Sequence, residues 1–222
     1  MSDGTPAWLA AFETRTERFE HGSTSWSLTL PRSMEDHFDL DAFETDERLP
    51  YWADLWPSAK ALARWVLDGN ANEPEVVEIG SGVALVSLAF RSIGASVLAT
   101  DYEDIALQFA AENARRNGLD PLRTARFDWR DPVVPEPAPL VIGADVLYEA
   151  RNAVAIAELL PRIVTPGGRA ILADPGRPWR GKFRELLHRA GWVVSESPLG
   201  SEPGPTARAV DILLLECRNG IR

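Results

Sequence analysis

The sequence contains few residues of the kinds that form disulfides or bind metals. Its 222 residues include one cysteine, Cys217, and three histidines. A single cysteine excludes an internal disulfide and a cysteine-based zinc site, and three scattered histidines argue against a catalytic metal. No hydrophobic run approaches the ~20 residues of a membrane span, and the opening residues, MSDGTPAW, do not resemble a secretory signal. These absences predict a cytoplasmic protein without a metal ion and without contact with a membrane.

Positive charge is also scarce. The chain has 23 lysines and arginines against 33 aspartates and glutamates, a formal net charge of −10. Nucleic-acid binding draws its affinity from clustered basic residues, so the composition argues against a nucleic-acid substrate. The net negative charge favours binding of a basic partner, but it also favours solubility on its own. Residues 35–48 hold seven acids and one arginine; the segment either guides a lysine-bearing partner to the protein or forms a solvated loop.

From Glu75 onward, short apolar runs alternate with amphipathic segments. This alternation predicts an α/β fold, a Rossmann-like doubly wound sheet with helices on both faces. Strands are expected near 75–79, 96–100, 124–128, 140–144 and 169–173, with helices near 84–93, 104–117, 151–162 and 180–190. The segments WVVSESPLG and AVDILLLECR are expected to pair as a hairpin, which gives seven strands with the last one antiparallel.

The first part of the chain follows a different pattern. Residues 1–49 are predicted to be an N-terminal extension of a single domain at 50–222. A helix is expected within residues 1–20, and Ser23–Leu30 alternates polar and apolar residues as a half-buried strand does. Pro57 suits the first position of a further helix.

The segment Val76–Leu85, VVEIGSGVAL, carries a glycine-rich turn after a buried strand. Gly80 and Gly82 allow a tight turn against a ligand, and Asp101 ends the next strand, where a carboxylate can accept ribose hydroxyls. Glu78, before the first glycine, would repel a pyrophosphate but tolerates a cationic group. The motif therefore favours S-adenosylmethionine over NAD or FAD as the cofactor; an ordinary βα turn is the alternative.

Four segments carry a family resemblance: PYWADLWPSAKALARWVLD at 50–68, EIGSGVALVSLA at 78–89, IGADVLYE at 142–149 and ADPGRP at 173–178. With these segments the chain resembles class I S-adenosylmethionine-dependent methyltransferases. Within that class it is similar to the family 16 protein methyltransferases, and most similar to the electron-transfer flavoprotein β-subunit lysine methyltransferase group. Where such relatives have a third glycine, this chain has Ala84.

The resemblance implies transfer of a methyl group from S-adenosylmethionine to a lysine of a protein substrate, such as a protein like the electron-transfer flavoprotein β-subunit. Two alternatives stay open, because a fold does not fix a function. One is a small-molecule N-methyltransferase that acts on an amine or a pyridine. The other is a catalytically silent binding module. The oligomeric state and the role of residues 1–49 do not follow from the sequence.

Asp145 and Tyr148 are the expected catalytic residues, because they follow the strand at 140–144 and ligands in open parallel sheets bind beyond the carboxyl ends of the strands. Asp145 is expected to attract and orient the lysine ammonium, and Tyr148 to form a wall of the lysine channel. The alternative is a helix N-cap and an ordinary core tyrosine. Arg177 either holds an acidic group of the substrate or pins its own loop to the sheet.

Ten residues are expected to contact the cofactor: Trp56, Glu78, Gly80, Ser81, Gly82, Asp101, Tyr102, Asp128, Trp129 and Ala144. The resemblance implies the role of Trp56, which as a bare tryptophan is more often part of a core. Asp128 is placed to accept the adenine amino group, or else it is an acid of a turn. Tyr102 either stacks on adenine or covers the edge of the sheet.

Overall fold

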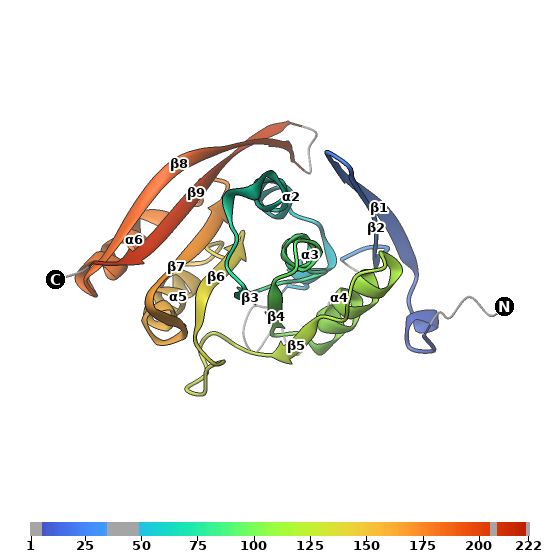
Figure 1. Ribbon diagram of the computed structural model, residues 1–222, viewed down its shortest axis with the longest axis horizontal. Helices are drawn as coiled ribbons and strands as arrows, with labels where there is room; N and C mark the ends of the chain where they lie inside the picture. The colour runs from blue at the N-terminus through green and yellow to red at the C-terminus, as the bar shows by residue number, and fades with distance from the viewer. Residues whose placement is uncertain (1–5, 35–48, 205–207, 221–222) are drawn as a thin grey trace.

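The computed structural model describes residues 6–34, 49–204 and 208–220, so the acidic segment 35–48 lies outside the described residues (Figure 1). The strands are β1 (Thr14–His21), β2 (Thr24–Pro31), β3 (Glu75–Ile79), β4 (Ser96–Asp101), β5 (Arg123–Arg126), β6 (Ala138–Ala144), β7 (Val164–Asp174), β8 (Trp192–Pro203) and β9 (Ala209–Asn219). The α-helices are α2 (Pro57–Trp65), α3 (Leu85–Ser92), α4 (Asp104–Arg116), α5 (Ala150–Ile163) and α6 (Arg180–Arg189). Single helical turns of other types are η1 (Leu9–Ala11), η3 (Tyr51–Ala53) and η4 (Val66–Asn70).

The main sheet has seven strands in the order β5-β4-β3-β6-β7-β9-β8. Strands β3 to β7 pair in parallel, whereas β9 runs antiparallel to both of its neighbours. The predicted Rossmann-like sheet with an antiparallel last strand is therefore confirmed, and the predicted strands and helices match the observed ones closely. One difference is that β7 begins at Val164, whereas the sequence predicted a strand only near 169–173.

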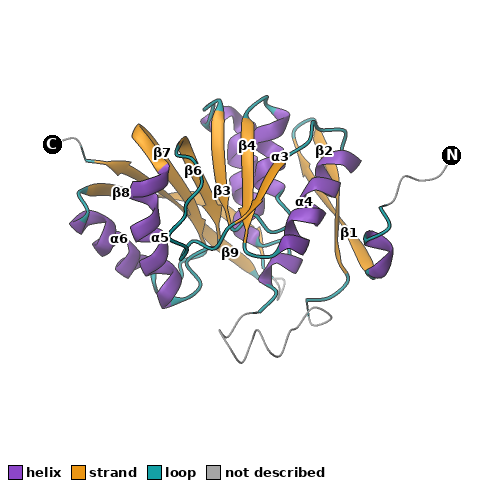
Figure 2. Cartoon of the chain, turned by 90° about the horizontal axis from the view of Figure 1, so that it is seen from below, coloured by secondary structure: helices purple, strands orange, loops and turns teal. Residues whose placement is uncertain are grey.

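Helices cover both faces of this sheet (Figure 2). On one face, α2, α3 and α4 bury side chains such as Leu62, Leu88 and Phe109. On the other face, α5 and α6 bury Ile156 and Phe183, among others. Both layers rest on the Val- and Ile-rich central strands, which are buried on both sides as a parallel sheet requires. No helix within the described ranges is long and apolar enough to cross a membrane.

Within the described part of residues 1–20, the expected helix is reduced to the single turn η1, because Thr14–His21 forms a strand of a second, two-stranded sheet. Strands β1 and β2 pair antiparallel, with Phe19 opposite Trp26 and their rings stacked at 5.8 Å. Asn113 of α4 fixes the hairpin: its side chain accepts the Thr29 amide at 2.7 Å and donates to the Thr29 carbonyl at 3.1 Å. The hairpin thus packs against α4 (Figure 1).

Candidate functional site

The turn between β3 and α3 has the backbone conformation that its glycines predict. Gly80 and Gly82 have φ values of 62° and 51°, and Ala84, at the position of a third glycine, also has a positive φ of 67°. The Ser81 amide donates to the Thr100 carbonyl of β4 at 2.9 Å, which ties the turn to the neighbouring strand. The turn therefore directs backbone N–H groups and the Ser81 side chain toward the carboxyl ends of the strands.

Two aromatic residues lie against this turn and leave no room for larger side chains. A Cβ atom on Gly80 would lie 3.1 Å from the Trp129 ring, and a Cβ on Gly82 would lie 3.3 Å from the Trp52 carbonyl oxygen. The two contacts come from different parts of the chain, because Trp129 follows β5 whereas Trp52 belongs to η3. Glycine is required here both for its positive φ and for the close approach of its neighbours.

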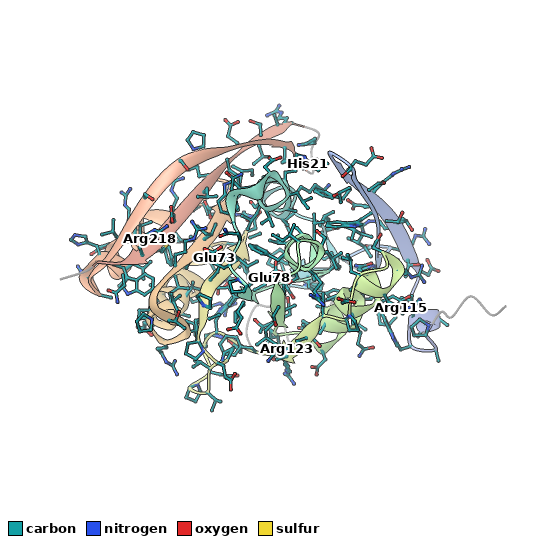
Figure 3. All side chains as sticks on the ribbon, in the orientation of Figure 1. His21, Glu73, Glu78, Arg115, Arg123 and Arg218 are labelled. Atoms are coloured by element: carbon teal, nitrogen blue, oxygen red, sulfur yellow. The ribbon has the colours of Figure 1, made fainter. Side chains whose placement is uncertain are left out.

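Glu78 is buried at the end of β3, close to the middle of the molecule (Figure 3). Its Oε2 atom accepts the Ser87 amide at 2.9 Å and also the Ser87 hydroxyl. Burial raises the pKa of Glu78 to about 8, although both hydrogen bonds from Ser87 favour the ionised form. A cation in the cavity would be stabilised by the ionised carboxylate and would lower this pKa.

Asp101 is buried at the end of β4, one strand away. Its Oδ2 accepts the Gly82 amide at 2.8 Å, and its Oδ1 accepts the Glu103 amide at 3.0 Å. Burial raises the pKa of Asp101 to about 6, against the effect of these two hydrogen bonds. Each carboxylate oxygen retains a further lone pair, so Asp101 can still accept hydrogen bonds from a diol.

Asp145 follows β6 in a left-handed conformation, with φ 61°. Its side chain is 5% exposed and forms an ion pair with Arg177, whose Nε and Nη2 both donate to Oδ1, at 2.9 and 2.8 Å. Ser58 Oγ donates to the other oxygen, Oδ2, at 3.2 Å. Arg177, for which the sequence left two roles open, therefore contacts a predicted catalytic residue directly.

Aromatic rings line the cavity beside Asp145. The Tyr148 ring lies 5.0 Å from the Tyr51 ring, edge to face, and Trp56 lies 5.8 Å from Tyr51. Trp56 Nε1 also donates to the Tyr51 carbonyl at 2.8 Å. Burial raises the pKa of Tyr148 to about 12, so its hydroxyl stays protonated at neutral pH. The three rings form an apolar wall with a π-face available to a cation.

The residues after β5 form a further side of the cavity. Asp128 accepts hydrogen bonds from the backbone amide and the side chain of Arg130, at 2.7 to 2.9 Å. Tyr102, after β4, packs its ring under the guanidinium of Arg126 at 5.1 Å. The Asp128 carboxylate and the Tyr102 ring are thus each contacted by an arginine, a feature that the sequence pattern does not reveal.

The structure places all twelve predicted site residues on one cavity of about 280 Å³. They are Trp56, Glu78, Gly80, Ser81, Gly82, Asp101, Tyr102, Asp128, Trp129, Ala144, Asp145 and Tyr148. The sequence analysis missed further lining residues, among them Tyr51, Trp52, Phe127, Glu149 and Asn152, whereas Arg177, which it considered, also lines the cavity. Tyr51 and Trp52 had a usable signal, because they belong to the aromatic segment at 50–68, whereas Phe127 and Asn152 resemble ordinary core positions.

A family model described as lysine methyltransferase matches residues 35–180. The chain belongs to this family. Its fold and its relatives identify it as an S-adenosylmethionine-dependent methyltransferase, as the sequence motifs predicted.

Individual relatives agree with this family. The electron transfer flavoprotein beta subunit lysine methyltransferase of Mus musculus is 33% identical over 191 residues, which cover 78% of this chain and 70% of the relative. The ribosomal protein L11 methyltransferase of Stenotrophomonas maltophilia (strain R551-3) is 29% identical over 196 residues, 86% of this chain and 61% of the relative. The chain thus spans 61 to 70% of the length of these two curated relatives.

A solved structure supports the fold of this methyltransferase. The ribosomal protein L11 methylase from Lactobacillus delbrueckii subsp. bulgaricus superposes with a TM-score of 0.57 at 21% identity, over 72% of this chain and 77% of that chain. At this identity the likeness concerns the fold alone.

The residues around the cavity of this methyltransferase fit S-adenosylmethionine. Ser81 Oγ is buried and lacks a hydrogen-bond partner among the described residues, although it lines the cavity. Buried polar groups are almost always hydrogen-bonded, so this hydroxyl favours a polar ligand beside the glycine turn. Asp101 offers carboxylate lone pairs for a ribose, and Glu78 offers a buried carboxyl group for the cationic part of the cofactor. The described residues include no cluster of three or more potential metal ligands.

Proposed function

We propose that this methyltransferase transfers a methyl group to lysine side chains of a protein substrate. The observation that carries the proposal is the position of the Asp145 to Tyr148 segment, which shares one cavity with the glycine turn. The relatives named as lysine methyltransferase and as ribosomal protein methyltransferase act on proteins, which supports a protein acceptor.

The cavity has a cofactor side and an acceptor side in this proposal. On the cofactor side, Asp101 holds the ribose, Glu78 and Ser81 face the amino-acid part, and Asp128 with Trp129 holds the adenine. Trp56, Tyr102 and Ala144 complete the contacts, next to Gly80 and Gly82. The cofactor, when bound, supplies an electrophilic methyl group on a positively charged sulfur.

On the acceptor side, the residues of this chain orient an amine. Asp145 accepts a hydrogen bond from the lysine nitrogen, and the rings of Tyr148 and Tyr51 enclose the aliphatic part of the side chain. The π-faces of Tyr148 and Tyr51 also favour the positive charge that develops on the nitrogen as the new N–C bond forms. Because the reaction is a displacement without a metal, positioning of the amine is the main contribution of these residues.

A methylation assay with isotopically labelled S-adenosylmethionine tests this function. The native chain is incubated with purified electron-transfer flavoprotein β-subunit, with ribosomal protein L11 and with a lysate, and mass spectrometry locates the label. Label on lysine side chains supports the proposal, and the Asp101→Ala variant serves as a control for cofactor binding. Label found only in small amines, or only on protein N-termini, would contradict it.

A further inference from the structure

The carboxylate on the acceptor side is already paired with a cation. Arg177 donates two hydrogen bonds to Oδ1 of Asp145, at 2.9 and 2.8 Å, and Asp145 is 6% exposed. An incoming ammonium therefore meets an ion pair and not a free negative charge. Building on the proposed function, we propose that Arg177 is a positioning residue: it fixes the Asp145 carboxylate and cancels its charge, so that the substrate lysine reacts as a neutral amine.

The backbone around both partners holds the pair in place. Asp174 Oδ1 accepts the amides of Gly176 and Arg177, at 2.8 and 2.7 Å, and this shapes the loop after β7. Gly176 has a φ of 83°, which lets the loop turn back toward β6. On the other side, the Asp145 amide donates to the Ala173 carbonyl at 2.9 Å. Adjacent parallel strands thus present the two side chains to each other before any substrate arrives.

The positive partner of Asp145 is Arg177, and the acid nearby has a different arginine as its partner. Glu149, on the same segment as Asp145, forms an ion pair with Arg151 of α5. Burial raises the pKa of Asp174, with the Asp145 charge adding to the rise and Arg180 of α6 opposing it. Uncharged groups also lie on this cavity: Ser58 of α2 donates to Asp145, and burial raises the pKa of both Tyr148 and Tyr51 of η3, which line the same cavity.

The protonation state of the substrate lysine explains why a carboxylate paired with a guanidinium is useful here. A lysine ammonium has a pKa near ~10.4, so making it neutral at pH 7.5 costs about 4 kcal/mol. A buried, unpaired carboxylate would stabilise the ammonium and raise that cost, whereas the guanidinium of Arg177 opposes this effect. The ammonium gives its proton to water at the cavity mouth. The nitrogen lone pair then forms the new N–C bond as the C–S bond breaks, and the electron pair of that bond stays on sulfur.

The experiment compares the pH dependence of turnover in Arg177→Gln, Arg177→Lys and the native chain. At saturating cofactor and substrate, the acid limb of kcat reports ionisation in the bound complex. For Arg177→Gln we expect the pKa of the acid limb to rise by roughly one pH unit or more, so that turnover near pH 7 becomes about tenfold slower. The rate approaches the native plateau at high pH, and KM near pH 7 does not rise. Arg184→Gln is the matched control, because it removes an exposed arginine of α6 that pairs with Glu196 of β8.

Arg177→Lys separates charge from geometry, since it keeps the positive charge and loses the two-point contact. We expect its acid limb to stay near the native position while its plateau falls. A limb that moves in Arg177→Lys as far as in Arg177→Gln would overturn the proposal, and so would an equal loss of kcat at every pH in Arg177→Gln. If Arg177→Gln does not fold, the pKa of the acid limb of kcat in Arg177→Lys decides by itself. Failure of the proposed function is distinguishable, because the native chain would then methylate no lysine at all.

Discussion

Glu78, the last residue but one of β3, accepts the backbone amide of Ser87 in the first turn of α3 at 2.9 Å. The same carboxylate lines the cavity. It therefore satisfies a free N–H group at the start of the helix, where the helix dipole also favours negative charge. One buried acid thus serves both the packing of α3 and the polarity of the cavity.

Replacing Glu78 by glutamine is expected to change how stability depends on pH. Burial raises the pKa of this carboxyl from 4.5 to about 8, so between these values the folded chain binds a proton that the unfolded chain has released. The free energy of unfolding of the cofactor-free protein then falls as pH rises, by up to about 1.4 kcal/mol per pH unit. Thermal unfolding of Glu78→Gln should show a flatter profile over this window. Glu75→Gln, on the exposed start of the same strand, is the control, and an unchanged slope in Glu78→Gln would contradict the assignment.

Asp101→Ala is expected to weaken S-adenosylmethionine binding by roughly 1 to 3 kcal/mol, because it removes charge-assisted hydrogen bonds to the ribose. Calorimetric titration measures this change. Asp104→Ala is a matched control, since Asp104 is an exposed acid at the start of the next helix. Tight binding of NADH together with no binding of the methyl donor would refute the assignment of the cofactor side.

Asp145→Ala is expected to abolish turnover while cofactor affinity stays within about tenfold of the native value, because this side chain faces the acceptor. Single-turnover kinetics at saturating cofactor measure the chemical step, and equilibrium titration measures the affinity. A parallel loss of affinity and rate would instead make Asp145 a structural or cofactor residue.

Gly82→Ala is expected to lower both stability and cofactor affinity. A side chain at positive φ costs about 1 to 2 kcal/mol, and the new Cβ would also press on the Trp52 carbonyl at 3.3 Å. Gly94→Ala isolates the first effect, because Gly94 has a φ of 92° and open space around it. Chemical denaturation and cofactor titration of both variants are compared; equal effects in the two variants would show that the contact with Trp52 is unimportant.

Arg64 joins the two hairpins through α2, and its loss is expected to cost roughly 1 to 3 kcal/mol of unfolding free energy. Its guanidinium donates to Glu202 of β8, which is 8% exposed, and lies 5.2 Å from the Phe19 ring of β1. Chemical denaturation of Arg64→Ala measures the loss. Arg189→Ala removes an exposed ion pair with Glu185 and should change stability by less than about 1 kcal/mol. If the two variants are equally stable, Arg64 contributes no more than a surface pair.

The sequence by itself determined the central sheet and the part of the cavity built around the glycine turn. Strands such as β3 and β6 are short buried runs of branched residues, and the helices between them have an apolar face, so local hydrophobic periodicity was sufficient. Gly80, Gly82 and Asp101 follow strand ends, and parallel strands bring their carboxyl ends to one edge of the sheet. A local pattern combined with that rule was enough to place all of them on one cavity.

The tertiary structure decided the features that depend on contacts between distant segments. Strand β1 has a single well-buried side chain, Phe19, in a run of charged residues, so its periodicity was too weak to predict it. The ion pair of Asp145 with Arg177 joins residues 32 positions apart, and the bond from Ser58 spans 87 positions. Such pairs form because the sheet order sets β7 beside β6 and α2 packs nearby. Hydrophobic periodicity specifies each element but not which polar side chains of different elements meet.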